Sequence, residues 1–477
     1  MKILSIASEM YPLVKTGGLG DVAGALPVAL TQLGEDVRVM VPGYRQVFDS
    51  MEPPGSWIPL GDPLGAGEAR LGLGRLPGED LPVWVVDCPD LYDRKGGAYL
   101  DRKGKDWADN HLRFAMLCRA AAMVCDAGAQ LGWRPDIVHA HDWQAGLLPA
   151  YLALRGGRRP ASVFTIHNIG FGGLFPATVL PDVGLPEESF SQHGVEFYQQ
   201  LSFLKAGIHY SDHVTTVSPT YAEEVLTEEG GMGFSGVLAA RQDDLSGILN
   251  GIDTHVWNPA GDPLIAHPFE SAKMTGKRAN KAALQEETGL EVRRDIPLLG
   301  IISRFTVQKG LDLVLQALPE ILAQGAQLVV LGSGDPDQER AFAVAAKAHP
   351  GQFQLRVGYD EAFAHRIQAG CDMLLVPSRF EPCGLTQLYA MRYGTLPIVR
   401  RTGGLADTVV DVKDGKENTG FVFEKATAED LNGAVTRALA LFRHPRKWSI
   451  VQRRAMVQNF SWQSSAQRYR DLFQTLV

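Results

Sequence analysis

The chain has 477 residues, of which 45% are hydrophobic and 21% are charged, and its formal net charge at pH 7 is -8. Because one hydrophobic core seldom supports a chain of this length, we expect two domains of roughly 200 residues or more. The composition is that of a globular protein and excludes a fibre or an extended disordered tail. The negative charge disfavours binding to nucleic acid or to a membrane surface, although a local basic site for a small phosphorylated molecule is compatible with it.

Cysteine usage points to a reducing compartment. The chain has five cysteines and no CxxC pair, which predicts reduced thiols in a cytoplasmic protein and neither a disulfide framework nor a zinc site. Residues 1–10, MKILSIASEM, lack the long apolar region and the cleavage site of a signal peptide. No stretch reaches about 18 apolar residues, so no membrane span is expected.

Short apolar strands alternate with amphipathic helices along the chain, which is the pattern of a parallel sheet covered by helices. The predicted strands of the first half are KILSIAS, VRVMVP, PVWVVDC, DIVHAH, ASVFTIH and HVTTVS. Those of the second half are PLLGIISR, AQLVVLGSG, FQLRVGY, CDMLLVPS and TLPIVRR. The fold class is therefore α/β with two doubly wound Rossmann-like domains, predicted at residues 1–248 and 249–458, with a cleft expected between them. A C-terminal helix, 459–477, is expected to follow, and its packing on the first domain is one option.

The stretch KTGGLGD follows the first predicted strand and leads into a predicted helix, GDVAGALPVALTQLG. Backbone N–H groups at such a helix start attract anions, and Gly17 and Gly18 would let a ligand approach the backbone closely. Lys15 adds a mobile positive charge, and Asp21 closes the motif. The alternative is a simple turn with a solvated lysine. No GxGxxG fingerprint of a dinucleotide site is present.

Two other strand ends in the first half carry polar groups. DIVHAHDW places His139, His141, Asp142 and Trp143 at the carboxyl end of a strand, the side on which open α/β sheets bind ligands. A metal site is disfavoured because no third well-spaced donor is visible, and Asp142 could simply cap the next helix. FTIHNIGFGG likewise ends a strand with His167 and Asn168. Both groups are consistent with one binding site.

The second half has its own cationic strand end. Arg304 follows the strand PLLGIIS, and Lys309 lies just before the next helix, which suits a diphosphate. Further along, Glu381 precedes a helix start at Pro382-Cys383-Gly384-Leu385, and a second glycine pair follows at Gly403-Gly404. A capping role for Glu381 and a surface ion pair for Arg304 are the alternatives.

At these residues the chain resembles the bacterial glycogen synthases and plant starch synthases over its whole length. The motifs that carry the resemblance are KTGGLGDV at 15–22, HAHDW at 139–143, TIHNIGF at 165–171, NGID at 250–253, SRFTVQKGLD at 303–312, EPCGLTQLYAM at 381–391 and RTGGLADTV at 401–409. The resemblance implies the GT-B fold of glycosyltransferases, with a nucleotide sugar held mainly by the C-terminal domain and a glucan acceptor by the N-terminal domain. It implies transfer of glucose from ADP-glucose to a glucan with retention of configuration, without a cofactor or a metal.

The resemblance also implies roles for individual residues. Four would lie at the reacting bond: Arg304 and Lys309 at the leaving diphosphate, Glu381 at the ribose or donor glucose, and His167 beside the reacting glucose. The other expected substrate contacts are Lys15, Gly17, Gly18 and Asp21 at the distal phosphate end, Asp142, Trp143, Asn168 and Asn250 near the sugars, and Cys383, Gly384 and Leu385 through their backbone. The glycine-rich segments 170–173 and 230–236 are expected to be loops that move.

Two positions depart from the pattern of relatives. Many retaining GT-B enzymes have a second glutamate eight positions after the first, where this chain has Tyr389, and this subfamily is known to lack that glutamate. Gly20 replaces an alanine, a change expected to matter little beyond helix propensity. The alternatives left open are a nucleotide-sugar epimerase, another GT-B enzyme that uses UDP-glucose, and a silent sugar-binding protein. The oligomeric state is also open.

Overall fold

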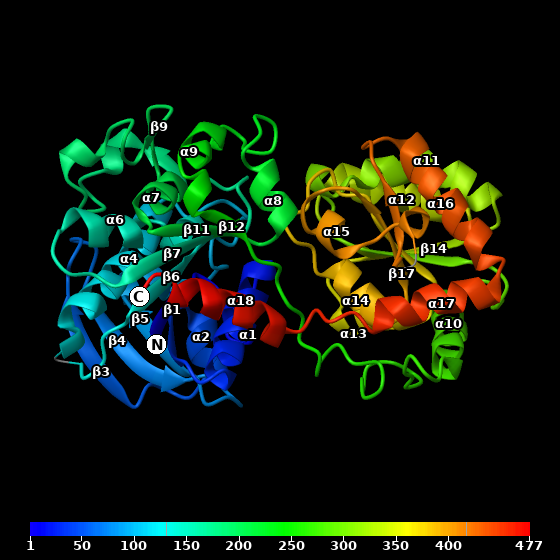
Figure 1. Cartoon of the computed structure of the whole chain (residues 1–477), viewed down its shortest axis with the longest axis horizontal. Helices are drawn as coiled ribbons and strands as arrows, with labels where there is room; N and C mark the ends of the chain where they lie inside the picture. The colour runs from blue at the N-terminus through cyan, green and yellow to red at the C-terminus, as the bar shows by residue number, and fades with distance from the viewer. Residues whose placement is uncertain (130, 416) are drawn as a thin grey trace. The chain divides into compact units, whose positions relative to one another are not determined.

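The fold is described from a computed structural model over residues 1–129, 131–415 and 417–477. Within these residues the chain divides into two compact units (Figure 1). Unit 1 comprises Met1–Gly251 together with Trp462–Val477, and unit 2 comprises Ile252–Ser461. The expectation of an α/β fold with two domains built on parallel sheets is confirmed.

Unit 1 is built on a sheet to which nine strands of the described chain contribute, in the order β12-β11-β7-β6-β1-β2-β5-β4-β3. These strands are β1 (Lys2–Ile6), β2 (Asp36–Pro42), β3 (Ser56–Gly61), β4 (Ala69–Arg75), β5 (Pro82–Asp87), β6 (Ile137–His141), β7 (Ala161–Ile166), β11 (His213–Thr216) and β12 (Leu245–Gly247). Neighbouring strands are parallel except at the β3–β4 and β4–β5 pairs. A separate small sheet consists of β8 (Leu174–Pro176), β10 (Gln200–Ser202) and β9 (Glu196–Phe197).

Helices of unit 1 lie on both sides of its large sheet (Figure 1). They are α1 (Gly18–Gln32), α2 (Arg45–Ser50), α3 (Pro89–Tyr92), α4 (Asn110–Asp126), α5 (Asp142–Ala145), α6 (Leu147–Leu154), α7 (Phe203–Tyr210), α8 (Pro219–Glu224), α9 (Ser235–Ala239) and α18 (Trp462–Gln474). Helix α18 packs against α1, and an ion pair of 2.9 Å joins Arg470 Nε to Glu35 Oε1. The C-terminal helix therefore belongs to the first unit.

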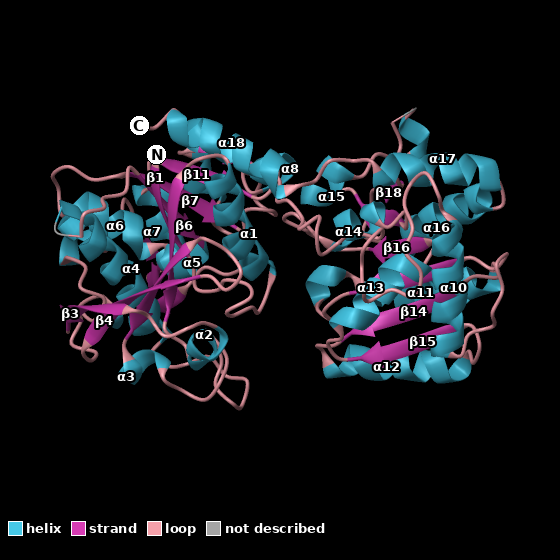
Figure 2. Cartoon of the chain, turned by 90° about the horizontal axis from the view of Figure 1, so that it is seen from below, coloured by secondary structure: helices cyan, strands magenta, loops and turns pink. Residues whose placement is uncertain are grey.

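Unit 2 contains a parallel sheet formed, within the described residues, by six strands in the order β15-β14-β13-β16-β17-β18. The strands are β13 (Leu298–Ile302), β14 (Gln327–Gly332), β15 (Phe353–Val357), β16 (Met373–Val376), β17 (Leu396–Arg400) and β18 (Phe421–Phe423). Numbered within the unit, this order is 3-2-1-4-5-6, the arrangement of a dinucleotide-binding fold. Its topological switch point lies between β13 and β16. The sheet is seen as one layer of strands in Figure 2.

Helices also cover both faces of the second sheet (Figure 1). They are α10 (Thr275–Thr288), α11 (Leu311–Ala323), α12 (Pro336–Ala348), α13 (Glu361–Gly370), α14 (Thr386–Arg392), α15 (Gly403–Thr408), α16 (Ala428–Phe442) and α17 (Pro445–Met456). Because helices cover the sheet on both sides and β13 and β15 flank it, strand β14 is buried along its whole length, which explains its mostly apolar sequence QLVVLG. None of the helices in the described ranges is both long enough and apolar enough to span a membrane.

All eleven strands predicted from sequence are present in the structure. The predicted helix at 20–34 begins instead at Gly18 and ends at Gln32. The strands β3, β4, β12 and β18 and the small sheet were not predicted. Proline and alternating glycines obscure the pattern in SWIPLG and ARLGLGR, and LSG and FVF are too short to show one.

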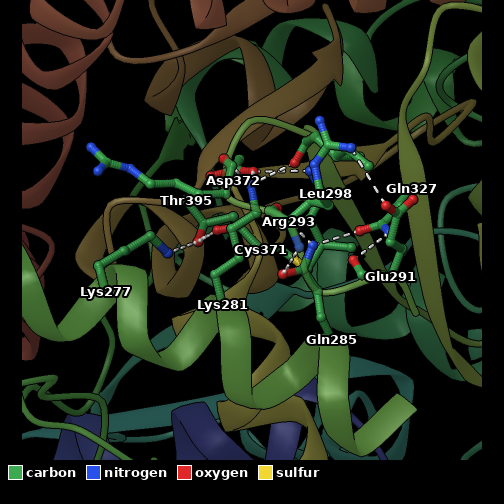
Figure 3. Close-up of polar contacts among 12 residues, drawn as sticks. Lys277, Lys281, Gln285, Glu291, Arg293, Leu298, Gln327, Cys371, Asp372 and Thr395 are labelled. Carbon is green, nitrogen blue, oxygen red and sulfur yellow. Dashed lines mark hydrogen bonds and ion pairs between the residues drawn. The ribbon is translucent and has the colours of Figure 1, made fainter. Parts of the chain in front are cut away.

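A buried polar network fixes α10 to the sheet of unit 2 (Figure 3). Lys277 donates to the Thr395 hydroxyl at 2.5 Å and to two carbonyls at the end of α13, and burial lowers its pKa to about 7. One turn later, Lys281 forms an ion pair of 2.7 Å with Asp372. The same Asp372 oxygen accepts the backbone N–H of Leu298 at 2.9 Å. The network therefore connects α10 to the starts of β13 and β16.

Replacing Asp372 by Asn is expected to destabilise unit 2 by about 3 kcal/mol, because the Lys281 ammonium then stays buried without its counter-charge. Urea unfolding followed by circular dichroism measures the change. Asp295→Asn is the matched control, because Asp295 pairs with Arg293 on the surface and water replaces that partner. An equal response of the two variants would contradict the assignment of Asp372 as the structural anchor.

Candidate active site

The predicted site residues of unit 2 follow the two strands that flank its switch point. Lys309 lies in the connection after β13, and Glu381 lies in the connection after β16. In open α/β sheets, ligands bind outside the carboxyl ends of the strands at this point. Strand order therefore gives a structural reason for two segments that are 72 positions apart in the sequence to lie together.

Lys309 and Glu381 form a direct ion pair. The lysine Nζ donates to Glu381 Oε2 at 2.6 Å, and the hydroxyl of Ser378 donates to the same oxygen at 2.8 Å. Both partners are largely shielded from solvent, and the carboxylate more than the ammonium. A lysine ammonium has three N–H donors, so Lys309 can keep this contact and still donate to a bound anion.

Arginine side-chain hydrogen bonds and close backbone packing hold this pair in position. The loop at 376–380 is fastened by Arg379, which binds Asp312 through two bonds of 2.7 and 2.6 Å, and by Arg400, which donates to the Ser378 carbonyl at 3.0 Å. Gly310, with φ of +64°, lies so close to the Pro377 carbonyl that a side chain would collide with it. The site is thus preorganised on its own unit.

The second glycine pair has a structural role. Gly404 donates to the carbonyls of Glu381 and Pro382 at 3.1 Å each. A Cβ atom on Gly403 would collide with the Glu381 carbonyl, and one on Gly404 with Cys383. Close approach of α15 to the glutamate loop therefore requires glycine at both positions.

The remaining predicted residues of unit 2 are placed differently. Cys383 is buried, and Gly384 takes a left-handed φ of +71° just before α14, where Leu385 is the N-cap.

Arg304 is exposed, and it makes no contact with the Lys309–Glu381 pair in the described residues. Tyr389 stacks on Trp257 with ring centroids 3.8 Å apart, and an apolar stack therefore occupies the place of the second glutamate.

In unit 1, the KTGGLGD motif forms both a turn and a helix start. Lys15 Nζ binds Asp21 Oδ1 in the first turn of α1 at 2.7 Å. Gly17 is the N-cap, and Cβ atoms built on Gly17 and Gly18 would meet no atom within 4 Å. No packing among the residues that the structure describes requires these two glycines, so open space for a ligand remains as a reason for them.

Glu9 is a site residue that the sequence reasoning missed. Its Oε2 accepts the backbone N–H groups of Thr16 and Gly17, the latter at 3.0 Å, and Tyr99 donates to its other oxygen. The Gly17 amide, expected to contact a phosphate, is therefore already bound to a carboxylate. No short motif links Glu9 to Tyr99, which lies 90 positions later.

Gly20 is more constrained than helix propensity suggests. A Cβ at this position would lie 3.2 Å from Lys15 Cγ and 3.4 Å from Glu9 Oε2. An alanine would therefore press on the stem of the motif lysine and on the carboxylate that holds the loop. Whether the flexible Lys15 side chain shifts decides the effect of a methyl group here, so the expectation that this position matters little beyond helix propensity stays a prediction.

Three histidines lie in or just after strands β6 and β7, near the carboxyl ends of these strands. His141 Nδ1 lies 3.0 Å from His167 Nε2, and His141 Nε2 lies 3.3 Å from the Ser5 hydroxyl. Burial lowers the pKa of His167 to about 3 and that of His141 well below its ordinary value. Both rings are therefore neutral at physiological pH. His139 instead bonds to Thr165 at 2.6 Å and packs against Tyr469 of α18, so its role is structural.

Asp142 is held in a strained and buried position. Its φ is +56°, in the left-handed region that is costly for residues other than glycine. Its Oδ1 accepts the backbone N–H of His167 at 2.8 Å and that of Asn168 at 3.4 Å. Burial raises its pKa to about 7, although these two bonds oppose the shift. The carboxylate thus ties the end of β6 to the end of β7.

The other residues predicted near the sugars belong to the same unit. Trp143 packs edge-on against Phe114 at 4.9 Å, and only glycine at 173 leaves space for its ring. Asn168 Oδ1 accepts the Gly170 N–H at 3.0 Å and shapes the following turn. The buried Oδ1 of Asn250 has no hydrogen-bond partner among the described residues. A group of three or more metal-binding side chains is not found within those residues.

Comparison with family models matches both halves of the chain. Residues 2–240 match the model described as starch synthase catalytic domain, and residues 286–454 match glycosyl transferases group 1. A glycogen synthase of Rhodospirillum rubrum is 51% identical, covering 100% of this chain and 99% of that protein. One of Paramagnetospirillum magneticum is 52% identical, covering 100% of this chain and 98% of that protein.

Solved structures give the same match. The catalytic domain of starch synthase IV from Arabidopsis thaliana, bound to ADP and acarbose, has a TM-score of 0.88 and 35% identity, covering 99% of this chain and 98% of that chain. Sucrose-phosphate synthase from Thermosynechococcus elongatus has a TM-score of 0.61 at 18% identity, covering 100% and 98%, and supports the fold alone.

Replacing Asp142 by Asn is expected to stabilise the chain more at high pH than at low pH. In the folded chain the pKa of Asp142 lies above the ordinary value near 3.9. The wild-type protein therefore loses stability as the pH rises from about 4 to about 7, because the buried carboxyl must ionise. Asn keeps the acceptor oxygen, tolerates a left-handed φ and cannot ionise. Urea unfolding should show the advantage of the variant growing by about 2 kcal/mol from about pH 5 to about pH 8. A difference independent of pH would contradict a raised pKa.

Proposed function

The chain belongs to the family of bacterial glycogen synthases and starch synthases and elongates an α-1,4-glucan with glucose from ADP-glucose; on this premise we propose how its residues act. In this proposal unit 2 binds mainly the nucleotide sugar and unit 1 mainly the glucan. The five free and buried cysteines support the cytoplasm as the compartment of action.

Departure of the ADP group builds negative charge on its diphosphate, and Lys309 supplies the positive charge that stabilises it. The ammonium is held by Glu381 at 2.6 Å before any substrate binds, so little reorganisation is needed during the reaction. Arg304 is exposed near the same strand end and completes the neutralisation when its side chain turns to the diphosphate. The Lys309–Glu381 contact is the observation that carries this proposal.

Glu381 acts by binding and positioning. Its Oε2 is already occupied by Lys309 and Ser378, so the other oxygen is the one that accepts a hydroxyl of the donor. A carboxylate paired in this way is a poor nucleophile. We therefore favour displacement on one face of the sugar, in which a leaving phosphate oxygen accepts the proton of the attacking 4-hydroxyl. The α configuration is then retained without a covalent intermediate.

The groups of unit 1 contact the same substrates. Neutral His167 places its ring and backbone carbonyl beside the positive charge that develops on the reacting glucose, while Asp142 holds its N–H at 2.8 Å. Trp143, Asn168 and Asn250 bind the sugars through apolar contact and amides. Lys15, paired with Asp21, approaches the distal phosphate. The lack of side chains at Gly17 and Gly18 leaves space for that phosphate, while the Gly17 N–H stays bound to Glu9.

Loss of Lys309 should act on turnover. Lys309→Ala is expected to lower kcat by about two to three orders of magnitude, with a smaller change in the KM for ADP-glucose, because it removes a charge that matters most at the transition state. Steady-state incorporation of labelled glucose into glycogen measures both constants. Lys347→Ala, at an exposed lysine of the same unit, is the control. Near-normal turnover of Lys309→Ala would remove this residue from the mechanism.

Donor preference tests the proposed function directly. Glucose incorporation into glycogen is measured from ADP-glucose and UDP-glucose at equal concentration, and ADP-glucose is expected to dominate. Dominance of UDP-glucose would identify a different GT-B transferase. Isomerised donor without a lengthened glucan would instead identify an epimerase.

A further inference from the structure

Left-handed backbone outside glycine is confined to a few positions of the described chain: Asp142, Tyr198, Gln199 and Met232. Asp142 belongs to the site already described. The other three have φ values of 48°, 64° and 47°, and they cluster around two adjacent loops of unit 1. Such conformations persist only where surrounding contacts enforce them, and they gather at functional sites.

Hydrogen bonds of Glu196 and Lys205 hold the Tyr198–Gln199 turn. It joins β9 to β10, and the carboxylate of Glu196 accepts the Gln199 N–H at 2.7 Å. Buried Lys205 donates to the Glu196 carbonyl and, at 2.8 Å, to that of Gln192. The backbone is therefore fixed while the Tyr198 ring points outward, with 75% of the residue exposed.

Other exposed apolar side chains lie on loops near this turn. Phe171 is 56% exposed and Met232 is 40% exposed. Tyr198 lies edge-on against Phe197 at 4.7 Å, and Phe197 stacks face to face on Phe234 at 3.9 Å. Rings of this size are normally buried, and apolar groups gathered on a surface mark a binding site.

This surface continues from the candidate active site. Phe171 follows Asn168 by three positions, and its N–H bonds to the Asn168 carbonyl at 3.3 Å. A Cβ built on Gly170 would lie 3.6 Å from the sulfur of Met232, and one on Gly233 would lie 3.4 Å from the Tyr198 ring. The loop that contains Asn168 and Gly170 therefore lies beside Met232, and the adjoining Gly233 lies beside Tyr198.

We propose that Phe171, Tyr198 and Met232 form an aromatic platform that binds glucose units of the acceptor chain beyond the reacting sugar. The apolar face of a pyranose ring fits flat aromatic and thioether surfaces, and the exposed amides of Gln199 and Gln200 suit its hydroxyl groups. The platform rests on the glucan-elongating function and adds a preference for long acceptors. Short acceptors end before they reach Tyr198.

The test compares long and short acceptors in Tyr198→Asn and Tyr198→Phe. Asn suits the left-handed backbone but lacks the ring, whereas Phe keeps the ring. For Tyr198→Asn the KM for glycogen should rise about three- to tenfold, with kcat on maltotriose and the KM for ADP-glucose unchanged. Affinity electrophoresis in amylose without ADP-glucose should show the same weakening. Tyr198→Phe should bind glycogen as tightly as the wild-type chain does.

A control variant and two outcomes distinguish the aromatic platform from the glucan-elongating function. Val292→Ala, at an exposed apolar residue of unit 2, should leave every readout unchanged. A wild-type chain that fails to extend glycogen contradicts the function. A wild-type chain that extends glycogen, combined with a Tyr198→Asn variant of normal glycogen affinity or with equal losses on glycogen and maltotriose, contradicts the platform alone.

Discussion

The 2.6 Å ion pair between Lys309 and Glu381 is the contact on which the chemistry of unit 2 depends. A lone ammonium at a strand end would be mobile, and a lone carboxylate buried there would be costly. Together they hold each other, and the bonds of Arg379, Arg400 and Gly404 around them keep the loop rigid. The protein thus fixes the position of the Lys309 ammonium at the carboxyl end of the sheet.

The candidate site of unit 1 differs from that of unit 2, because its central side chains carry little charge. Burial keeps His141 and His167 neutral and raises the pKa of Asp142 to about 7. In the proposed mechanism such a neutral, polar surface suits a sugar better than a cationic one, which would repel the positive charge of the reacting carbon. Lys15 and Asp21, the charged residues of the KTGGLGD motif, form an ion pair with each other at the start of α1.

The parallel strands could be predicted from the sequence because they depend on local pattern, whereas the roles assigned to the site residues remain predictions. Apolar runs such as QLVVLG identify buried strands, and polar residues after them lie at the ligand side. The sequence did not predict Glu9 as a partner of the KTGGLGD backbone, or the tyrosine stack at Tyr389, because those contacts join distant segments. Nor did it show that Gly20 lies close to Lys15 and Glu9, which is visible only in three dimensions.

Helix α18 gives unit 1 an unusual dependence on the order of synthesis. Its Tyr469 and Phe473 cover His139, and its Arg470 pairs with Glu35, yet all of Ile252–Ser461 is translated between these partners. While the ribosome makes unit 2, the α1 side of unit 1 stays uncovered. Unit 2 is continuous and can close its own core first, so the unit that begins the chain is the later one to be completed.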